Sequence, residues 1–542
     1  KSATWPPLYT VTFRRFGREK GTCRETVKQT KLLGDFAGIE KIELPYTVND
    51  LTLEIVQDNL SAILSQHGRN AKKISYLLDY VDGAHQDIYD KTRKFETDES
   101  HNNKIIENHA DALVSFKEGY LLGDKREFSQ KSDVQTDDLI YLERYLCDSD
   151  FYSQDLIIKH NVYATGIATS FIQPRTDIIK KEKDNVSRYK TLDEGYDIDN
   201  DSPFLYEALD SRFNAVVYSD RVGQKEKDLF CFNISFIKEN NSRKKIITVY
   251  TREWTAKFDA CCKYIPGSYI ETPSQYKELP MVEHSLNKSR IGIIEKVLDP
   301  LNAINLVVSN EADNIVDVVN QILVFLNCEI DEDTLREAYK KGAIAVPSTA
   351  FGQASVDKIA IDLKHSEINV FFEQLLTRCY DICGVPLASA NVTSGGDTGQ
   401  ARLLGGGWTN AYTIIKRDII AFESADRDVL RKMLLICKQN PLNKVDKLSI
   451  NQIDIKYNVN MSDNLLVKTQ SLQNLVDAGL PYEDILKAIN LWSDTKTVAK
   501  RWRENVTAQS DQGQIDESKL VEHDGTARAV APLNNTTIST SD

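Results

Sequence analysis

The stretch from Val297 to Leu335 constrains the fold of this chain more than any other, because its 39 residues include eight carboxylates and no Lys or Arg. Asp299-Pro300 favours a helix start, since Asp can accept hydrogen bonds from the first free N–H groups and Pro suits the first helical position. After Pro300, no glycine or further proline occurs before Gly342. We therefore expect one long helix within this stretch.

Apolar residues recur along this helix at spacings of three and four, and at 100° per residue they gather into one packing stripe. The stripe consists of Leu301, Ile304, Val308, Ala312, Ile315, Val319, Ile322 and Leu326. A roughly opposite arc is polar or acidic and consists of Asn302, Asn305, Ser309, Asp313, Asp317 and Asn320. We expect one side of the helix to pack against protein and the other side to face a partner that it does not bind tightly. An ordinary surface helix shows the same two faces, so the pattern alone assigns no function.

The composition is that of a folded protein, with 41% hydrophobic and 27% charged residues over 542 positions. This length would ordinarily divide into about two to four domains. The net charge is -13. Proteins that grip nucleic acid are usually basic, because Lys and Arg displace the counterions of phosphate. Tight binding of nucleic acid is therefore disfavoured.

The nine cysteines and eight histidines do not suggest a metal site, because the sequence contains no Cys-x-x-Cys pair and no zinc spacing. We expect reduced, intracellular thiols and neither a metal nor another cofactor. No segment has eighteen consecutive apolar residues, and the first residues lack the apolar core of a signal peptide. We expect no membrane association.

The N-terminal half predicts helices followed by a sheet. Helical periodicity covers 48–66, 70–93, 101–118, Asp137–Leu146 and Ser153–Asn161, and the glycines of Gly119–Gly123 predict the end of the third helix. Alternating apolar residues predict strands at Ala164–Ile172, Phe213–Tyr218, Leu229–Ile237 and Ile246–Trp254. An antiparallel sheet packed with the earlier helices, ending near Pro280, is expected.

The C-terminal half predicts a helical hairpin. A second amphipathic helix covers Glu367–Cys383, and the insertion before it has candidate strands at Ala343–Val346 and Lys358–Ile361. Such a slender hairpin does not bury its own stripes, so it must pack on copies of itself or on another domain. A loop of small residues, Gly384–Gln400, follows with Asp397 as its one charge. Long loops of this kind are usually functional or disordered.

The remaining C-terminal segments are a helix, a strand and a short helical region. The helix covers 401–438 and contains Gly405, Gly406 and Gly407, which predict a kink or hinge. A strand is expected at Ile450–Val459, short helices at Ser462–Val506, and a mobile tail beyond Ala508.

Signatures of catalysis are missing from the sequence. The segment 394–400, SGGDTGQ, lacks the Lys of a P-loop and follows a helix rather than a strand. Neither GxSxG nor HExxH occurs. The acidic clusters at Asp137-Asp138 and Asp331–Asp333 could bind Mg²⁺, but we expect them to cap helices or to lie in solvent. The sequence therefore does not favour an enzyme.

Three segments, in this order, resemble the portal proteins of tailed bacteriophages, of the long-tailed phage type. They are GYLLG at 119–123, LPMVEH at 279–284 with the Asn and helix that follow, and SGGDTGQA at 394–401. The resemblance covers roughly residues 45–505. It implies an α+β portal fold, with a mixed α/β wing domain, long stem helices, a small α/β clip insertion and a helical crown.

The resemblance also implies how the chain is divided. The regions are the wing (1–287), the stem helix region (288–327), the clip (328–363), the second stem helix (364–383), the tunnel loop (384–400), the kinked helix and strand that return to the wing (401–460), the helical crown (461–508) and a flexible tail (509–542).

In function, the resemblance implies a dodecameric ring at one capsid vertex of the virion, made in the host cytoplasm. Double-stranded DNA would pass through its channel non-specifically, during packaging and ejection. The implied partners are the terminase large subunit, the major capsid and scaffolding proteins, and a head–tail adaptor. Two alternatives stay open: another head–tail connector ring, and a nucleotide-dependent packaging enzyme.

Site residues follow from the same resemblance and from the two faces of the long helix. The expected lining of the DNA channel in the tunnel loop is Ser389, Asn391, Thr393, Ser394 and Asp397. The expected channel face of the stem is Asp313, Asp317 and Asn320. The expected packing face of the stem is Ile304, Val308, Ile315, Val319 and Ile322. The expected helix kink is Gly405, Gly406 and Gly407.

Overall fold

The computed structural model describes residues 38–84, 86–92, 102–130, 137–175, 197–224, 227–239, 242–271, 277–319, 322–326, 355–359, 365–387, 408–439 and 443–459, with short pieces between 472 and 504. The chain divides into two units, Lys1–Ala37 and Gly38–Asp542, and all described residues belong to the second. Helices and strands are mixed throughout the described residues, which confirms the α+β class.

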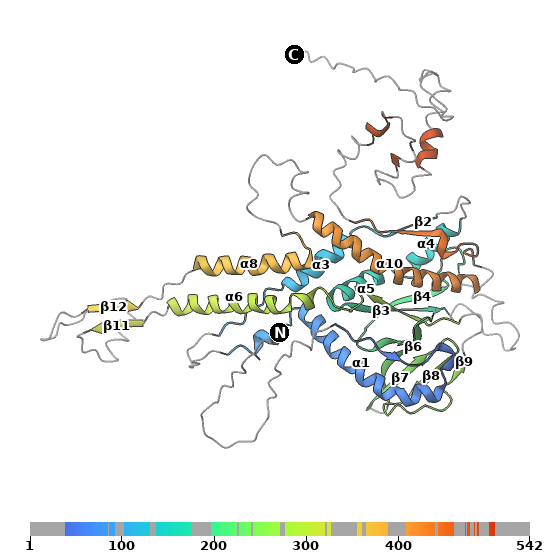
Figure 1. Cartoon of the computed structure of the whole chain (residues 1–542), viewed down its shortest axis with the longest axis horizontal. Coiled ribbons are helices and arrows are strands. Elements are labelled where there is room, and N and C mark those ends of the chain that lie inside the picture. Colours follow the sequence, from blue (N-terminus) through green and yellow to red (C-terminus); the bar gives the residue numbers. More distant parts are fainter. Residues whose placement is uncertain are drawn as a thin grey trace, which may run out of the picture. The chain divides into compact units, whose positions relative to one another are not determined.

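A six-stranded sheet in the order β1-β5-β6-β7-β8-β9 forms one layer (Figure 1). Its strands are β1 (Glu43–Leu44), β5 (Asn214–Ser219), β6 (Asp228–Glu239), β7 (Ser242–Tyr250), β8 (Trp254–Phe258) and β9 (Ile270–Glu271). Pairing is antiparallel except between β1 and β5. Helix α1 (Leu53–Val81) covers one face, and its Val56, Leu60 and Ile63 are in the same buried cluster as aromatic residues of β6. This cluster is the core of the layer.

A three-stranded antiparallel sheet in the order β10-β3-β4 forms the next layer. Its strands are β3 (Ile167–Pro174), β4 (Phe204–Leu209) and β10 (Met281–Ser285). Helix α5 (Phe151–Thr165) packs on β3 and β4, and α10 (Trp408–Gln439) packs along β10. The small sheet is therefore enclosed by helices from both halves of the chain.

The remaining elements complete these layers. They are α2 (Gln86–Tyr89), α3 (His109–Leu122), α4 (Asp138–Asp148), β2 (Glu127–Gln130), β13 (Ile453–Lys456) and three short 3-10 turns, η1 (Val48–Asp50), η2 (Ile294–Lys296) and η3 (Ile450–Gln452). Strands β2 and β13 pair antiparallel, although more than 300 residues separate them in sequence. This pair ties the C-terminal part of the chain to its N-terminal half.

Two long helices, α6 (Leu298–Val319) and α8 (His365–Cys383), pack side by side as the expected hairpin (Figure 1). Beyond them, β11 (Ile322–Leu326) pairs antiparallel with β12 (Ser355–Ile359). Helix α6 is therefore shorter than expected, and Ile322 and Leu326 belong to a strand. The run from Ile322 to Leu326 is apolar at every position, so a partner strand decides between helix and strand.

The expected helices of the N-terminal region differ from the observed ones in three places. The segments 48–66 and 70–93 mostly merge into α1, because one buried stripe continues past Gly68. The segment Asn102–Asn108 is extended, and α3 starts only at His109. Helix α3 then includes Gly119, because burial of Tyr120 and Leu121 outweighs a glycine penalty of about 1 kcal/mol.

Candidate functional site

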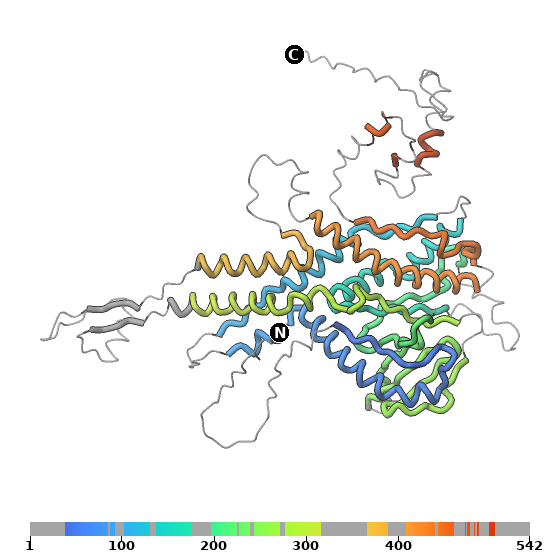
Figure 2. Tube along the Cα trace, viewed as in Figure 1, coloured from blue at the N-terminus to red at the C-terminus, as the bar shows by residue number. Residues whose placement is uncertain are grey.

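The polar side of α6 is covered by the extended segment Asn102–Asn108, which we call the strap. Figure 2 shows this part of the trace running beside α6. Side chains of α6 accept hydrogen bonds from alternate N–H groups of the strap. The bonds run from Glu107 N–H to Asn305 Oδ1 (2.9 Å), from Ile105 N–H to Ser309 Oγ (2.9 Å) and from Asn103 N–H to Asp313 Oδ1 (2.7 Å). Asn305, Ser309 and Asp313 of the polar arc therefore form a ladder of acceptors for the chain's own backbone.

The spacing of this ladder follows from backbone geometry. Four helical residues rise about 6 Å, and two extended residues span about 6.6 Å. Side chains at every fourth position of a helix therefore match N–H groups at every second position of a strand. The ladder gives hydrogen-bond partners to the backbone donors of this part-buried segment.

Asp313 ends the ladder in a buried ion pair. Its side chain is 2% exposed, and Lys91 Nζ donates to Asp313 Oδ2 at 2.7 Å. Asn103 Nδ2 also donates to Asp313 Oδ1, at 2.8 Å. Burial opposes the charge, but the hydrogen bonds from Lys91 and Asn103 hold the pKa of Asp313 below its usual value. The expectation that Asp313 faces a channel is therefore wrong, because its carboxylate is enclosed within one chain.

The other expected stem residues are distributed over different environments. Ile304 is buried within the chain, Val308 is half-buried, and Ile315 is half exposed. The side chains of Asp317, Val319 and Ile322 lie outside the described part of the structure, as does Asn320. The tunnel-loop residues Ser389, Asn391, Thr393, Ser394 and Asp397, and the glycines Gly405, Gly406 and Gly407, also lie outside it.

The hairpin exposes large apolar side chains that nothing in the described chain covers. Their exposed fractions lie between 44% and 54%. They are Leu306 and Ile315 on α6, and Val370, Phe371 and Ile382 on α8. Phe371 and Ile382 are eleven residues apart, so they lie about 20° apart around the helix. Leu306 and Ile315 are nine residues apart, so they face opposite sides of α6. The hairpin thus exposes apolar side chains on more than one side, which suits contact with other molecules.

A buried charge cluster, which the sequence analysis missed, joins α5, α10 and the segment before β2. Arg126 Nη2 lies 2.8 Å from Asp155 Oδ2, and Arg126 Nη1 lies 2.7 Å from Asp426 Oδ2. Lys159 Nζ donates to Asp426 Oδ1 at 2.8 Å. All four side chains are at most 3% exposed. Two cations and two carboxylates balance, and Tyr457 OH also donates to Asp426.

Only part of this charge cluster left a signal in the sequence. Asp155 and Lys159 are one helical turn apart in a segment expected to be helical, and such pairs are commonly exposed. They are buried because they meet Asp426 of α10, which is 267 residues from Lys159 in the sequence. No local sequence pattern indicates a contact between residues so far apart in the chain.

His284 lies beside this cluster and completes its polar surroundings. The side chain is fully buried, and its Nε2 lies 3.0 Å from Ser170 Oγ. Burial, with the nearby Lys159 cation, lowers the pKa of His284 to about 3. The imidazole is therefore neutral at pH 7. The arrangement braces several elements and offers no accessible reactive group.

Family comparison assigns the chain on the basis of most of its length. Residues 60–512 match the family described as "Phage portal protein, SPP1 Gp6-like". The chain belongs to this family. This confirms the expected resemblance and makes the portal protein a structural component of the bacteriophage virion, in an oligomeric assembly at the capsid vertex. No curated protein matches the chain.

The portal family is structural rather than enzymatic, in line with the missing catalytic signatures. Within the described residues, no group of three or more His, Cys, Asp or Glu is arranged to hold a metal ion. Among those same residues, no helix of the portal protein is long and apolar enough to span a membrane.

Replacing Ser309 with Ala is expected to lower the free energy of unfolding of the portal protein by about 1–3 kcal/mol. The variant leaves the part-buried N–H of Ile105 without its acceptor. Replacing the exposed neighbour Asn310 with Ala should change it by less than about 0.5 kcal/mol. Chemical denaturation of both variants measures the difference. Equal effects would mean that the ladder does not stabilise α6.

Proposed function

We propose that twelve copies of this portal protein form a ring at one capsid vertex, around a channel that DNA crosses during packaging and ejection. The ring would dock the terminase large subunit during packaging and a head–tail adaptor afterwards. Contacts with the major capsid and scaffolding proteins would hold it in the shell. The observation that carries the proposal is the exposed apolar surface of the α6–α8 hairpin.

The exposed apolar side chains of the hairpin support ring assembly for an energetic reason. Burying a fully exposed large apolar side chain contributes about 1.5–3 kcal/mol, so a half-exposed one contributes roughly 1 kcal/mol. The five exposed residues of the hairpin are repeated in every copy. In a closed ring each copy meets its neighbours through two different surfaces, so every hairpin gains cover on both sides.

The proposed channel rests on the charge of its lining. A dense row of Lys would trap phosphates and slow DNA, whereas the stretch from Val297 to Leu335 contains no basic residue. We propose Asp317 and Asn320 as stem residues that face the channel. The proposed narrowest lining is Ser389, Asn391, Thr393, Ser394 and Asp397. Small neutral side chains and carboxylates would let DNA slide.

Electron microscopy of the purified protein tests ring formation directly. We expect ring-shaped particles with a central hole and twelve-fold symmetry. Phe371→Glu, which places a charge in the exposed apolar surface, should reduce the fraction of rings at least tenfold. Gln374→Glu adds the same charge on the exposed side of the same helix and should leave most rings intact. Rings that persist in Phe371→Glu would refute the role of this surface, and monomers of the unmodified protein would refute the ring.

A further inference from the structure

The turn that connects β10 to α6 contains a strained residue. Arg290 has a φ of 53°, in the left-handed region that long side chains rarely adopt. The turn is closed by a hydrogen bond from Arg290 N–H to Asn287 O, at 3.0 Å. Such strain persists only where the surroundings over-determine the conformation.

Backbone packing holds the turn on two sides. A Cβ atom at Gly38 would lie 2.2 Å from Ser289 O, and one at Gly166 would lie 2.4 Å from Arg290 O. Both glycines have positive φ. The turn is thus wedged between two chain segments where no larger residue fits. Ile39 N–H donates to Arg290 O at 3.1 Å.

The Arg290 side chain makes a second attachment. Its Nη2 lies 2.6 Å from Glu283 Oε1, and both side chains are 9% exposed. The guanidinium also lies over the Tyr218 ring, 5.4 Å from the centroid. The ion pair therefore fastens the strained turn to the small sheet, through β10, and the ring contact joins it to β5 of the large sheet.

The segment Gly38–Leu44, which we call the clasp, joins the turn to the base of α6. Gly38 N–H donates to Glu295 Oε1 at 2.7 Å, directly before α6. Asn70 Nδ2 donates to Glu40 O at 2.8 Å. Only the last two residues of the clasp form a strand, β1, at the edge of the large sheet. Short edge strands are among the least stable parts of a sheet.

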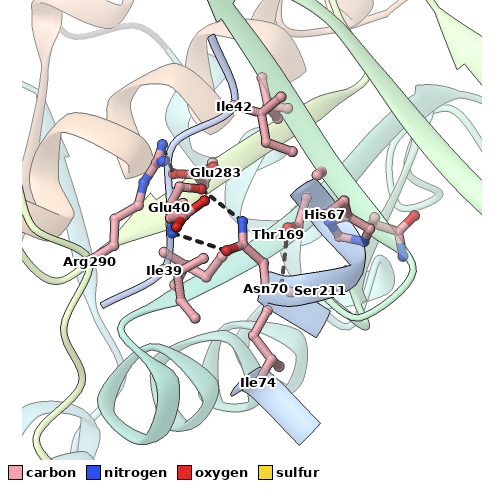
Figure 3. Close-up of a pocket in the computed structure, with 14 residues that line it drawn as sticks. Ile39, Glu40, Ile42, His67, Asn70, Ile74, Thr169, Ser211, Glu283 and Arg290 are labelled. Atoms are coloured by element: carbon pink, nitrogen blue, oxygen red, sulfur yellow. Dashed lines mark hydrogen bonds and ion pairs between the residues drawn. The ribbon is translucent and has the colours of Figure 1, made fainter. Parts of the chain in front are cut away.

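A small cavity lies beside the turn (Figure 3). Its volume of about 20 Å³ suffices for roughly one water molecule. The lining includes Ile39, Glu40, Asn70, Thr169, Glu283 and Arg290. Residues of the clasp, of the turn and of both sheets therefore line the same cavity.

We propose that the clasp and the Arg290 turn form a latch that sets the direction in which α6 leaves the wing. This structure shows the closed state, in which the clasp holds Arg290 in the left-handed region. When the clasp detaches, Arg290 relaxes to negative φ, its carbonyl leaves Ile39, and the base of α6 reorients. The hairpin then moves as one body, because α6 and α8 pack together. This inference is independent of ring formation.

Two substitutions at Arg290 separate the backbone conformation from the ion pair. Arg290→Asn and Arg290→Val both remove the guanidinium, but Asn tolerates the left-handed region whereas a β-branched Val strongly disfavours it. Hydrogen exchange read by mass spectrometry should show at least tenfold faster exchange for Val than for Asn in 38–44 and 291–300. Glu283→Gln keeps the backbone and should give a smaller increase in the same two segments. Amides of β6 and β7 should stay unchanged.

A control and a distance measurement make the test decisive. Arg252→Gln breaks another ion pair, with the partly exposed Asp228 of β6, and should leave both segments unchanged. Spin labels at the exposed Glu373 and Lys257, introduced as non-natural amino acids, should report a shifted or broadened distance in Arg290→Val only. Equal exchange in Arg290→Asn and Arg290→Val would overturn the latch. Uniformly faster exchange across the sheet in Glu283→Gln would overturn it too, because it would indicate global unfolding.

Discussion

Replacing Arg126 with Met is expected to lower the free energy of unfolding by about 3–5 kcal/mol. The reason is the enclosure of the charge cluster, in which Arg126 contacts both Asp155 and Asp426. Without the guanidinium, two buried carboxylates face a single Lys159 cation. A buried charge without its partner costs far more than the pair contributed. Denaturant titration followed by circular dichroism measures the change.

Two further variants show whether burial is the cause. Arg427→Met breaks a surface pair with Glu423, one helical turn away on α10, and should cost less than about 0.5 kcal/mol. Combining Arg126→Met with Asp155→Leu leaves Lys159 and Asp426 as a balanced pair. The double variant should therefore be more stable than Arg126→Met alone. A double variant that is less stable than Arg126→Met would contradict the charge-balance argument.

Lowering the pH below the ordinary pKa of histidine, 6.5, is expected to destabilise the fold because of His284. The pKa of His284 is about 3 in the folded chain, whereas its ordinary value is 6.5. Between these values the unfolded chain binds a proton that the folded chain excludes, so stability falls as the pH falls. From pH 8 to pH 5 the contribution of this one group amounts to a loss of about 2 kcal/mol.

Comparing how the free energy of unfolding depends on pH in the original protein and in His284→Gln isolates His284 from other titrating groups. The charged groups that act on the pKa of His284 are Lys159 on α5, Asp426 and Asp428 on α10, and Arg126 before β2. In His284→Gln the loss between pH 8 and pH 5 should be smaller by about 2 kcal/mol, whatever the starting stability. Hydrogen bonding to Glu118 raises the pKa of His160, so that group stabilises the fold in acid and is present in both proteins. Equal slopes would show that His284 binds its proton normally when folded.

The charge cluster and the strap hold different helices by similar means. The strap holds α6, and the charge cluster joins α5 to α10, in both cases through polar contacts whose partners lie far apart in sequence. Large apolar side chains stay half exposed along both helices of the hairpin, from Leu306 and Ile315 on α6 to Phe371 and Ile382 on α8. We infer that the strap holds α6 to its own chain, whereas the exposed apolar side chains of the hairpin depend on neighbouring copies for cover.

Much of the fold could be predicted from local pattern. Helix α8 was expected at Glu367–Cys383 and is found at His365–Cys383, and the expected strand at Leu229–Ile237 lies within β6. These elements have strong periodicity, so the local signal suffices. The family was evident from the order of three motifs. The apolar stripe of the hairpin also pointed to partners outside the single chain.

Only the tertiary structure decided which face of α6 is open. The sequence showed that Asn305, Ser309 and Asp313 form one polar arc, but not that the strap, about 200 residues earlier, lies on it. A polar arc that meets solvent and one that binds buried backbone have the same composition, because both need acceptors at helical spacing. The sequence alone shows that Val297–Leu335 contains no Lys or Arg. The enclosure of Asp313 required the fold, since burial depends on contacts that no local pattern encodes.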